Sequence, residues 1–271
     1  MAASPWEQRL DRLIRSESLS EAQLATAEMM DVVFPGGSAV TSDGSEVVRA
    51  IATTPQLGSH PFRAYLLWIL VLARRYVGVW RRAVEGGQAD AVAIAEAQSE
   101  VRTIEELTLA SDGVVEMIDD ADPEVRSLVY RLIGSALRSP RRAADLLVSA
   151  FEGEQDDLAR GCAAEALPIA LARQWPEVSN AETAWIRGVM ANGSPAIQGR
   201  MRHVLDGYAM IGVQDALKAS DKKAGDFVSL RGLEGDAALL QYFRVKCETM
   251  ESLLVMLARE IETLKKRDRP A

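Results

Sequence analysis

A stripe of apolar residues at helical spacing, which returns along the chain, constrains the fold more than any other feature. In the segment after Asp122, apolar residues stand at positions i, i+3, i+4, i+7, i+8, i+11 and i+12: Val125, Leu128, Val129, Leu132, Ile133, Ala136 and Leu137. This spacing places them on one face of a helix. Asp122 followed by Pro123 favours a helix start, because an aspartate oxygen accepts free N–H groups and proline fits the first turn. The segment therefore predicts a helix with one buried face.

The stripe occurs in two further copies. The second opens with Asp156, 34 positions after residue 122, places Arg160 at the position of Arg126, and carries Ala159, Cys162, Ala163, Ala166, Leu167 and Ala170 on the stripe. The third opens at Ser194, 38 positions after residue 156, and carries Ile197, Met201, Val204 and Leu205, with Arg200 at the position of Leu128. A single helical hairpin cannot bury its apolar face alone. A period of this length therefore predicts a solenoid of stacked hairpins.

The remaining sequence also favours helices. Apolar residues make up 48% of the chain and charged residues 26%, which is ordinary for a globular protein. Few stretches alternate as a half-buried strand does. Capping and helix-breaking residues predict further helices at about 5–15, 20–33 with Ser20 and Gln23 as a capping pair, 44–54, 61–84, 89–109 and 111–117. The sequence thus predicts an all-α chain.

The opening Asp122-Pro123-x-Val125-Arg126 resembles the HEAT-repeat family, particularly the bacterial form with short repeats that also occurs in phycobilin lyases. The resemblance implies a right-handed solenoid of helical hairpins with an extended groove for a partner, and Arg126 directed toward a neighbouring repeat. It implies no catalytic chemistry. The expected organisation is an N-terminal helical region of atypical or capping repeats at 1–110, HEAT-like repeats at 111–217, a linker at 218–235 and a long amphipathic helix at 236–271.

Charge and cysteine content bear on partners and compartment. The formal charge of −8 and the pI near 5.0 oppose binding to phosphate backbones and anionic lipids, so neither nucleic acid nor a membrane is expected as a partner. Cys162 and Cys247 lack the CxxC spacing of zinc sites. Residues 1–20 have no secretory apolar core, and the apolar run at 64–73 is too short to span a bilayer. We expect a cytoplasmic protein.

No arrangement of residues indicates catalysis. His60 and His203 belong neither to a metal-binding pair nor to a Ser-His-acid set. One enzymatic alternative stays open, a HEAT-like alkyl-purine DNA glycosylase, a family that uses tryptophans and an acidic residue on a basic concave face. Its candidate tryptophans here are Trp68, Trp80, Trp175 and Trp185. We expect no catalytic residue, no metal and no cofactor.

Two arginine pairs are the candidate partner-binding residues. Arg74-Arg75 and Arg81-Arg82 stand one heptad apart within the helix predicted at 61–84. On one face of a continuous helix they would form a basic ridge that suits phosphates or an acidic protein. The alternative is a solvated face whose long aliphatic stems cover apolar surface.

A heptad pattern marks the C-terminal segment, in which no proline or glycine occurs between residues 236 and 266. Apolar residues repeat every seven positions in two registers, Leu240, Cys247, Leu254 and Ile261 in one and Phe243, Met250, Leu257 and Leu264 in the other. This pattern predicts a parallel homodimeric coiled coil. The alternative is that the helix packs on its own solenoid and covers the apolar face of the last repeat.

Three functions of different classes remain open from the sequence. We expect a non-catalytic scaffold or adaptor that binds a protein partner through the solenoid face. An immunity or antitoxin-type neutralising protein is the second, which a neighbouring toxin gene would favour. The DNA glycosylase is the third, and it requires salt-dependent DNA binding and base release.

Overall fold

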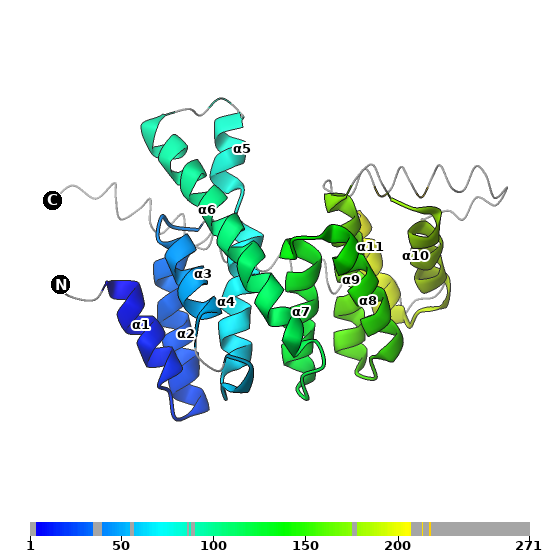
Figure 1. The fold of residues 1–271 in the computed structure, drawn as a ribbon, viewed down its shortest axis with the longest axis horizontal. Coiled ribbons are helices and arrows are strands. Elements are labelled where there is room, and N and C mark those ends of the chain that lie inside the picture. Colours follow the sequence, from blue (N-terminus) through cyan, green and yellow to red (C-terminus); the bar gives the residue numbers. More distant parts are fainter. Residues whose placement is uncertain are drawn as a thin grey trace. The chain divides into compact units, whose positions relative to one another are not determined.

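The computed structural model describes residues 4–34, 40–54, 57–85, 87, 90–174, 178–206, 213 and 217. These residues form α-helices and short 3-10 turns, and no β-strand occurs among them (Figure 1). The prediction of an all-α chain is therefore confirmed. The described residues divide into two compact units, one ending at Asp119 and the other beginning at Asp120. None of the described helices is both long enough and apolar enough to cross a membrane.

The first unit is built around the longest described helix, α6. Its elements are α1 (Pro5–Ile14), α2 (Leu19–Val33), α3 (Gly44–Ala52), η2 (Leu57–Ser59), α4 (Arg63–Tyr76), α5 (Val79–Glu85), α6 (Ala91–Val114) and η3 (Val115–Met117). Helix α6 contacts α3, α4 and α5, while α1 packs on α2, and α2 and α3 both reach α4. Leu13, Met29, Ile51, Leu66 and Leu107 are fully buried and form part of this core.

The start of α2 differs from the prediction. Ser4 caps α1 as expected, with a capping box to Glu7. The predicted pair of Ser20 and Gln23 at the start of α2 is wrong, because Ser18 caps this helix and exchanges hydrogen bonds with Glu21. The Glu21 carboxylate accepts from two backbone N–H groups, those of residues 17 and 18. A charged carboxylate is a stronger acceptor at a helix N-terminus than a neutral amide.

Two predicted helix boundaries in the first unit are also wrong. The continuous helix expected at 61–84 is interrupted between α4 and α5, where Val77 is extended and Gly78 has a φ of 92°. Glycine enters this left-handed region without steric cost. The break expected near residue 110 is absent, because α6 continues to Val114. The boundary of the predicted region 1–110 therefore falls inside a helix.

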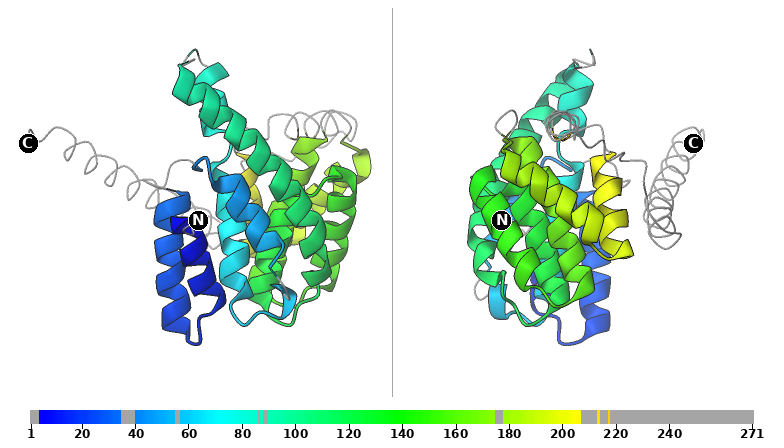
Figure 2. Two further views of the ribbon diagram at one scale, coloured as in Figure 1. Left: turned by 60° about the vertical axis from the view of Figure 1, so that its left-hand side comes forward. Right: turned by 90° about the vertical axis from the view of Figure 1, so that its right-hand side faces the viewer.

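The second unit contains the copies of the apolar stripe. Its helices are α7 (Pro123–Ala136), α8 (Pro140–Gly153), α9 (Asp157–Arg173), α10 (Asn180–Asn192) and α11 (Pro195–Leu205). Helix α9 lies at the centre and contacts α7, α8 and α11, while α10 packs on α11 (Figure 2). The stripe residues of α7 and α9 are all buried, as are Ile197, Met201 and Leu205 of α11. The prediction that each copy buries one helix face is confirmed for the first two copies.

The predicted linker at 218–235 and the predicted amphipathic helix at 236–271 lie outside the described residues. The eight oligomerisation residues of the heptad pattern belong to this segment. Their role in a homodimer therefore stays a prediction.

Candidate protein-interaction surface

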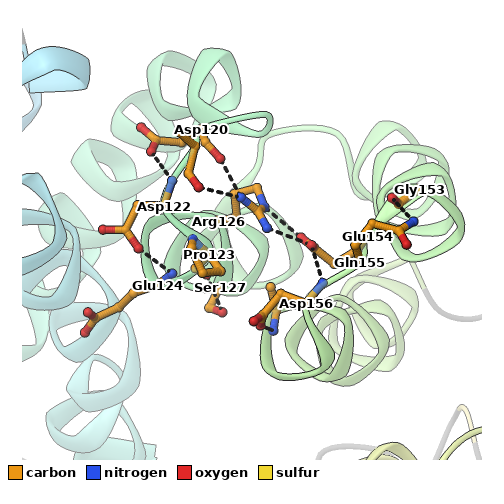
Figure 3. A network of polar contacts seen from close by, with 12 residues as sticks. Asp120, Asp122, Pro123, Glu124, Arg126, Ser127, Gly153, Glu154, Gln155 and Asp156 are labelled. Carbon is orange, nitrogen blue, oxygen red and sulfur yellow. Dashed lines mark hydrogen bonds and ion pairs between the residues drawn. The ribbon is translucent and has the colours of Figure 1, made fainter.

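Arg126 is the centre of a polar network that joins α7 to the turn between α8 and α9 (Figure 3). Its Nε and Nη2 atoms both donate to the Glu154 carboxylate at 2.7 Å. Its Nη1 atom donates to the backbone oxygen of Asp120 at 2.6 Å. The Tyr130 hydroxyl and the Asp156 backbone N–H donate to the same carboxylate, at 2.9 Å each. The Arg126 side chain thus fixes one helix to the turn that follows the next one.

The network is buried and its charges are strongly coupled. The Glu154 side chain is 3% exposed and that of Arg126 is 17% exposed. The hydrogen bonds from Arg126 overcome the effect of burial and, with the N–H of Asp156, lower the pKa of Glu154 to about 2. Burial and the Glu154 charge raise the pKa of Tyr130. Because every polar group here has a partner, the network fixes the position of α7 relative to the α8–α9 turn.

Helix α9 approaches both α7 and α11 closely. A Cβ atom at Gly134 of α7 would lie 2.5 Å from the backbone oxygen of Ala166 in α9, which leaves no room for a side chain. A Cβ atom at Gly161 of α9 would lie 2.9 Å from Cδ of Arg200 in α11. The small residues therefore let equivalent helices of successive copies pack side by side, and they give the Arg200 stem a place to lie.

Two arginines from the outer helices of this set converge on one carboxylate of the central helix. Nη1 of Arg200 lies 3.3 Å from Oε2 of Glu165, and Nη2 of Arg131 lies 3.7 Å from the same oxygen. The Arg131 side chain is 40% exposed, whereas those of Glu165 and Arg200 are 19% and 17% exposed. The cluster contains two positive charges and one negative charge, so it carries a surplus positive charge at the surface.

Apolar side chains adjoin this cluster on α9. Leu158 is 52% exposed and stands seven positions before Glu165, and the half-buried Ile169 stands four positions after it. These spacings place all three on one face of the helix. We call Arg131, Leu158, Glu165, Ile169 and Arg200 the α9 surface. Arginine is enriched at protein interfaces, and the exposed part of Leu158 offers apolar area that a partner could bury.

The four arginines predicted to bind a partner lie on two helices. Arg74 and Arg75 end α4, and Arg81 and Arg82 belong to α5 beyond the break at Gly78. The heptad spacing therefore does not place the four arginines on one face of a continuous helix. Burial lowers the pKa of Arg74, and the positive charge of Arg81 lowers it further. Their role in binding a partner stays a prediction.

The individual arginines of this group have different surroundings. Arg75 is exposed and its guanidinium lies 5.9 Å from the Tyr76 ring centroid. Arg81 pairs with Glu85 of the same helix at 3.4 Å. The side chain of Arg82 lies outside the part of the molecule that the structure describes. The pairings of Arg75 and Arg81 are local ones on a solvated face, where such contacts stabilise weakly.

Among the tryptophans and histidines, Trp185 and His60 make structural contacts. Trp185 meets Phe151 edge to face, with ring centroids 5.0 Å apart, while Trp68 is 40% exposed and Trp80 is half-buried. Trp175 lies outside the described residues. His60 bonds the backbone oxygen of Ile14 at 3.0 Å and accepts from the N–H of Phe62. Across the described residues, no group of three His, Cys, Asp or Glu side chains could hold a metal ion.

The residues of the α9 surface were not among the predicted site residues. Arg200 did carry a sequence signal, because it stands where the first copy of the stripe has Leu128. A charged residue at a position that is apolar in an equivalent helix favours a specific polar contact over core packing. Arg131 and Glu165 lie off the stripe, but they stand 34 positions apart at equivalent points of the first two copies and carry opposite charges, which is a signal that the same comparison could have used.

Comparison of the chain with protein-family models, curated proteins and solved structures finds no match. The geometry of the residues therefore carries the functional argument.

Proposed function

We propose that this protein is a non-catalytic helical-repeat scaffold of the HEAT type, which binds an acidic segment of a partner protein through the α9 surface. The observation that carries the proposal is the convergence of Arg131 and Arg200 on Glu165, from three equivalent helices packed side by side. Stacked helical hairpins create an extended surface of this kind without needing catalytic groups.

The charge arrangement favours a carboxylate-bearing partner. Glu165 neutralises only one of the two guanidinium groups, and a guanidinium binds carboxylates with paired, directional hydrogen bonds. An acidic side chain that enters beside Glu165 would complete the pairing of Arg131, which is the more exposed of the two arginines. Leu158 and Ile169 offer apolar contact area next to this point. A segment that alternates acidic and apolar residues fits this surface best.

Affinity capture from a native lysate tests the proposal. The baits are the full-length chain, a variant with Arg131→Glu and Arg200→Glu, and a control variant with Arg142→Glu. Arg142 is an exposed arginine of α8 outside the α9 surface, so its reversal changes the net charge without touching the cluster. Each capture is run with and without nuclease, and circular dichroism establishes that every bait is folded.

The proposal expects one stoichiometric protein on the wild-type and Arg142→Glu baits, independent of nuclease, and its loss from the double variant. Reversing two interfacial charges should weaken binding by at least about a hundredfold, since each buried charge pair contributes a few kcal/mol. Equal capture by all three baits would rule out the α9 surface as the binding site. Recovery of nucleic acid alone would favour the glycosylase alternative instead.

A further inference from the structure

Glu165 faces both positive charges of the α9 surface with one oxygen. Its Oε2 atom lies 3.3 Å from Nη1 of Arg200 and 3.7 Å from Nη2 of Arg131. These two guanidinium groups and one carboxylate leave a surplus of one positive charge. A neutral residue at position 165 would leave a surplus of two. The charge of Glu165 therefore sets how much negative charge a ligand must bring to balance this surface.

Helix packing keeps the Glu165 carboxylate beside the two arginines. A Cβ atom at Gly134 of α7 would lie 2.5 Å from the backbone oxygen of Ala166, so α7 and α9 are in close contact at the residue after Glu165. Gly161, four residues before Glu165, leaves the space in which the Arg200 stem lies. The Glu165 and Arg200 side chains are only 19% and 17% exposed. Their charges therefore stay close together and are screened less than those of a fully solvated pair.

A carboxylate and a phosphate monoester suit this surplus differently. A guanidinium group donates paired hydrogen bonds to either anion, so Arg131 and Arg200 alone would not distinguish the two. Near neutral pH the carboxylate carries one negative charge and the phosphate carries about −1.5 to −2. A carboxylate balances the surplus of one positive charge, whereas a phosphate exceeds it and faces the Glu165 carboxylate. Like charges that face each other in a binding site oppose binding.

Building on the proposed function of the α9 surface, we propose that Glu165 is its specificity-determining residue. It admits a glutamate or aspartate side chain of the partner and excludes a phosphorylated side chain. The incoming group approaches Arg131, which at 40% is the most exposed of the three charged side chains. The formal charge of −8 opposes phosphate over the whole chain, and Glu165 adds selectivity at the point of contact. Phosphorylation of the partner's segment at this point therefore weakens binding.

Peptide titrations of the full-length chain and of Glu165→Gln test this preference. The probes are two short blocked peptides of alternating leucine and serine, one with a central glutamate and the other with a central phosphoserine. NMR titration at low salt gives the dissociation constant of each peptide. Glu152→Gln is the matched control, because it removes the charge of an exposed glutamate on α8, outside the α9 surface. Glu165→Asp keeps the charge at position 165, and circular dichroism establishes that every variant is folded.

The wild type and Glu165→Asp should bind the glutamate peptide more tightly than the phosphoserine peptide. Glu165→Gln should bind the glutamate peptide about fivefold and the phosphoserine peptide about twentyfold more tightly than the wild type does, because the repulsion from a charge about 4 Å away grows with the charge of the ligand. Both gains should shrink as salt is added. Glu152→Gln should leave both dissociation constants nearly unchanged.

Equal gains for the two peptides in Glu165→Gln, or the same gains in Glu152→Gln, would overturn the role of Glu165. Tighter binding of the phosphoserine peptide by the wild type would overturn it without any variant. A wild type that binds neither peptide would speak against the proposed function instead, and the gain of Glu165→Gln for the phosphoserine peptide would still decide the role of Glu165.

Discussion

Replacing Glu154 with glutamine should destabilise the second unit by roughly 3 kcal/mol near neutral pH. The substitution keeps the size of the side chain and an oxygen for the Tyr130 hydroxyl, but it removes the charge that faces Arg126. The pKa of Glu154 is lowered from 4.5 to about 2. A pKa difference of one corresponds to about 1.4 kcal/mol, so this lowering of the pKa corresponds to roughly 3 kcal/mol by which the ionised carboxylate stabilises the fold. Removing one partner of a buried ion pair typically costs about 3–5 kcal/mol, which agrees with this value.

The dependence on pH follows from the direction of the pKa shift. Because the folded-state pKa lies below the unfolded-state value, the contribution of Glu154 is fully present above about pH 5. It is lost progressively as the pH falls from about 5 through the folded-state pKa of about 2, below which the carboxylate is protonated in both states. The stability difference between wild type and Glu154→Gln should therefore shrink progressively on acidification. The substituted chain should itself be less sensitive to acid in this range.

Hydrogen exchange and urea unfolding measure this prediction. Exchange of the α7 and α9 amides near neutral pH reports the opening free energy of the second unit, and urea unfolding followed by circular dichroism at about pH 7 and about pH 3 reports its pH dependence. Glu152→Gln is the matched control, because Glu152 is an exposed glutamate in the last turn of helix α8, two residues before Glu154. Equal stability of Glu154→Gln and wild type near neutral pH would refute the reasoning. A loss that persists unchanged at low pH would show that the charge is not its cause.

Three other perturbations test separate parts of the account. Gly134→Ala should lower stability by about 1–3 kcal/mol in thermal melting, since its Cβ would meet the Ala166 backbone oxygen at 2.5 Å, whereas Gly113→Ala, with nothing within 4 Å, should not. Arg200→Leu restores the apolar residue of the first copy, so we expect a melting temperature near that of wild type and reduced partner capture. Truncation after Gly235 should convert a dimer into a folded monomer in sedimentation; aggregation would favour packing of the C-terminal segment on the repeats instead.

Local sequence patterns predicted the three stripe-bearing helices of the second unit, α7, α9 and α11, because these helices follow simple packing rules, whereas α8 and α10 were not predicted. The apolar spacing after Asp122 identified the buried face of α7, and each of its residues is buried. The caps Asp122, Asp156 and Ser194 all bind backbone N–H groups at the start of their helices. Here periodicity and capping residues agree with each other, and such agreement is what specifies a helix boundary.

The first unit was harder to predict because tertiary contacts override its local signals. Nothing in the apolar run before Gly78 indicates a break, yet Glu100 of α6 accepts hydrogen bonds from the N–H groups of Trp80 and Arg81 and so stabilises a new helix start. An acceptor twenty residues away along the chain is not visible in a local pattern. The basic ridge was predicted from a heptad that this break interrupts.

The α9 surface was missed because its residues come from three helices that are far apart in the sequence. Only the register of the repeats places Arg131 and Arg200 on either side of Glu165. Sequence spacing fixes which face a residue occupies on its own helix, but not which side chain of the next helix it meets. Arg200 stands at a stripe position, so its charge could have indicated a polar contact, although the sequence analysis did not predict one.

Arginine-specific chemical labelling of the complex with the captured partner tests the central claim most directly. Labelling with phenylglyoxal, read by mass spectrometry, compares the reactivity of each arginine in the free chain and in the complex. The account predicts that Arg131 and Arg200 become protected, while the exposed Arg142 of α8 keeps its reactivity. Unchanged reactivity of Arg131 and Arg200, with protection at Arg75 and Arg81 instead, would contradict it and return the binding site to the first unit.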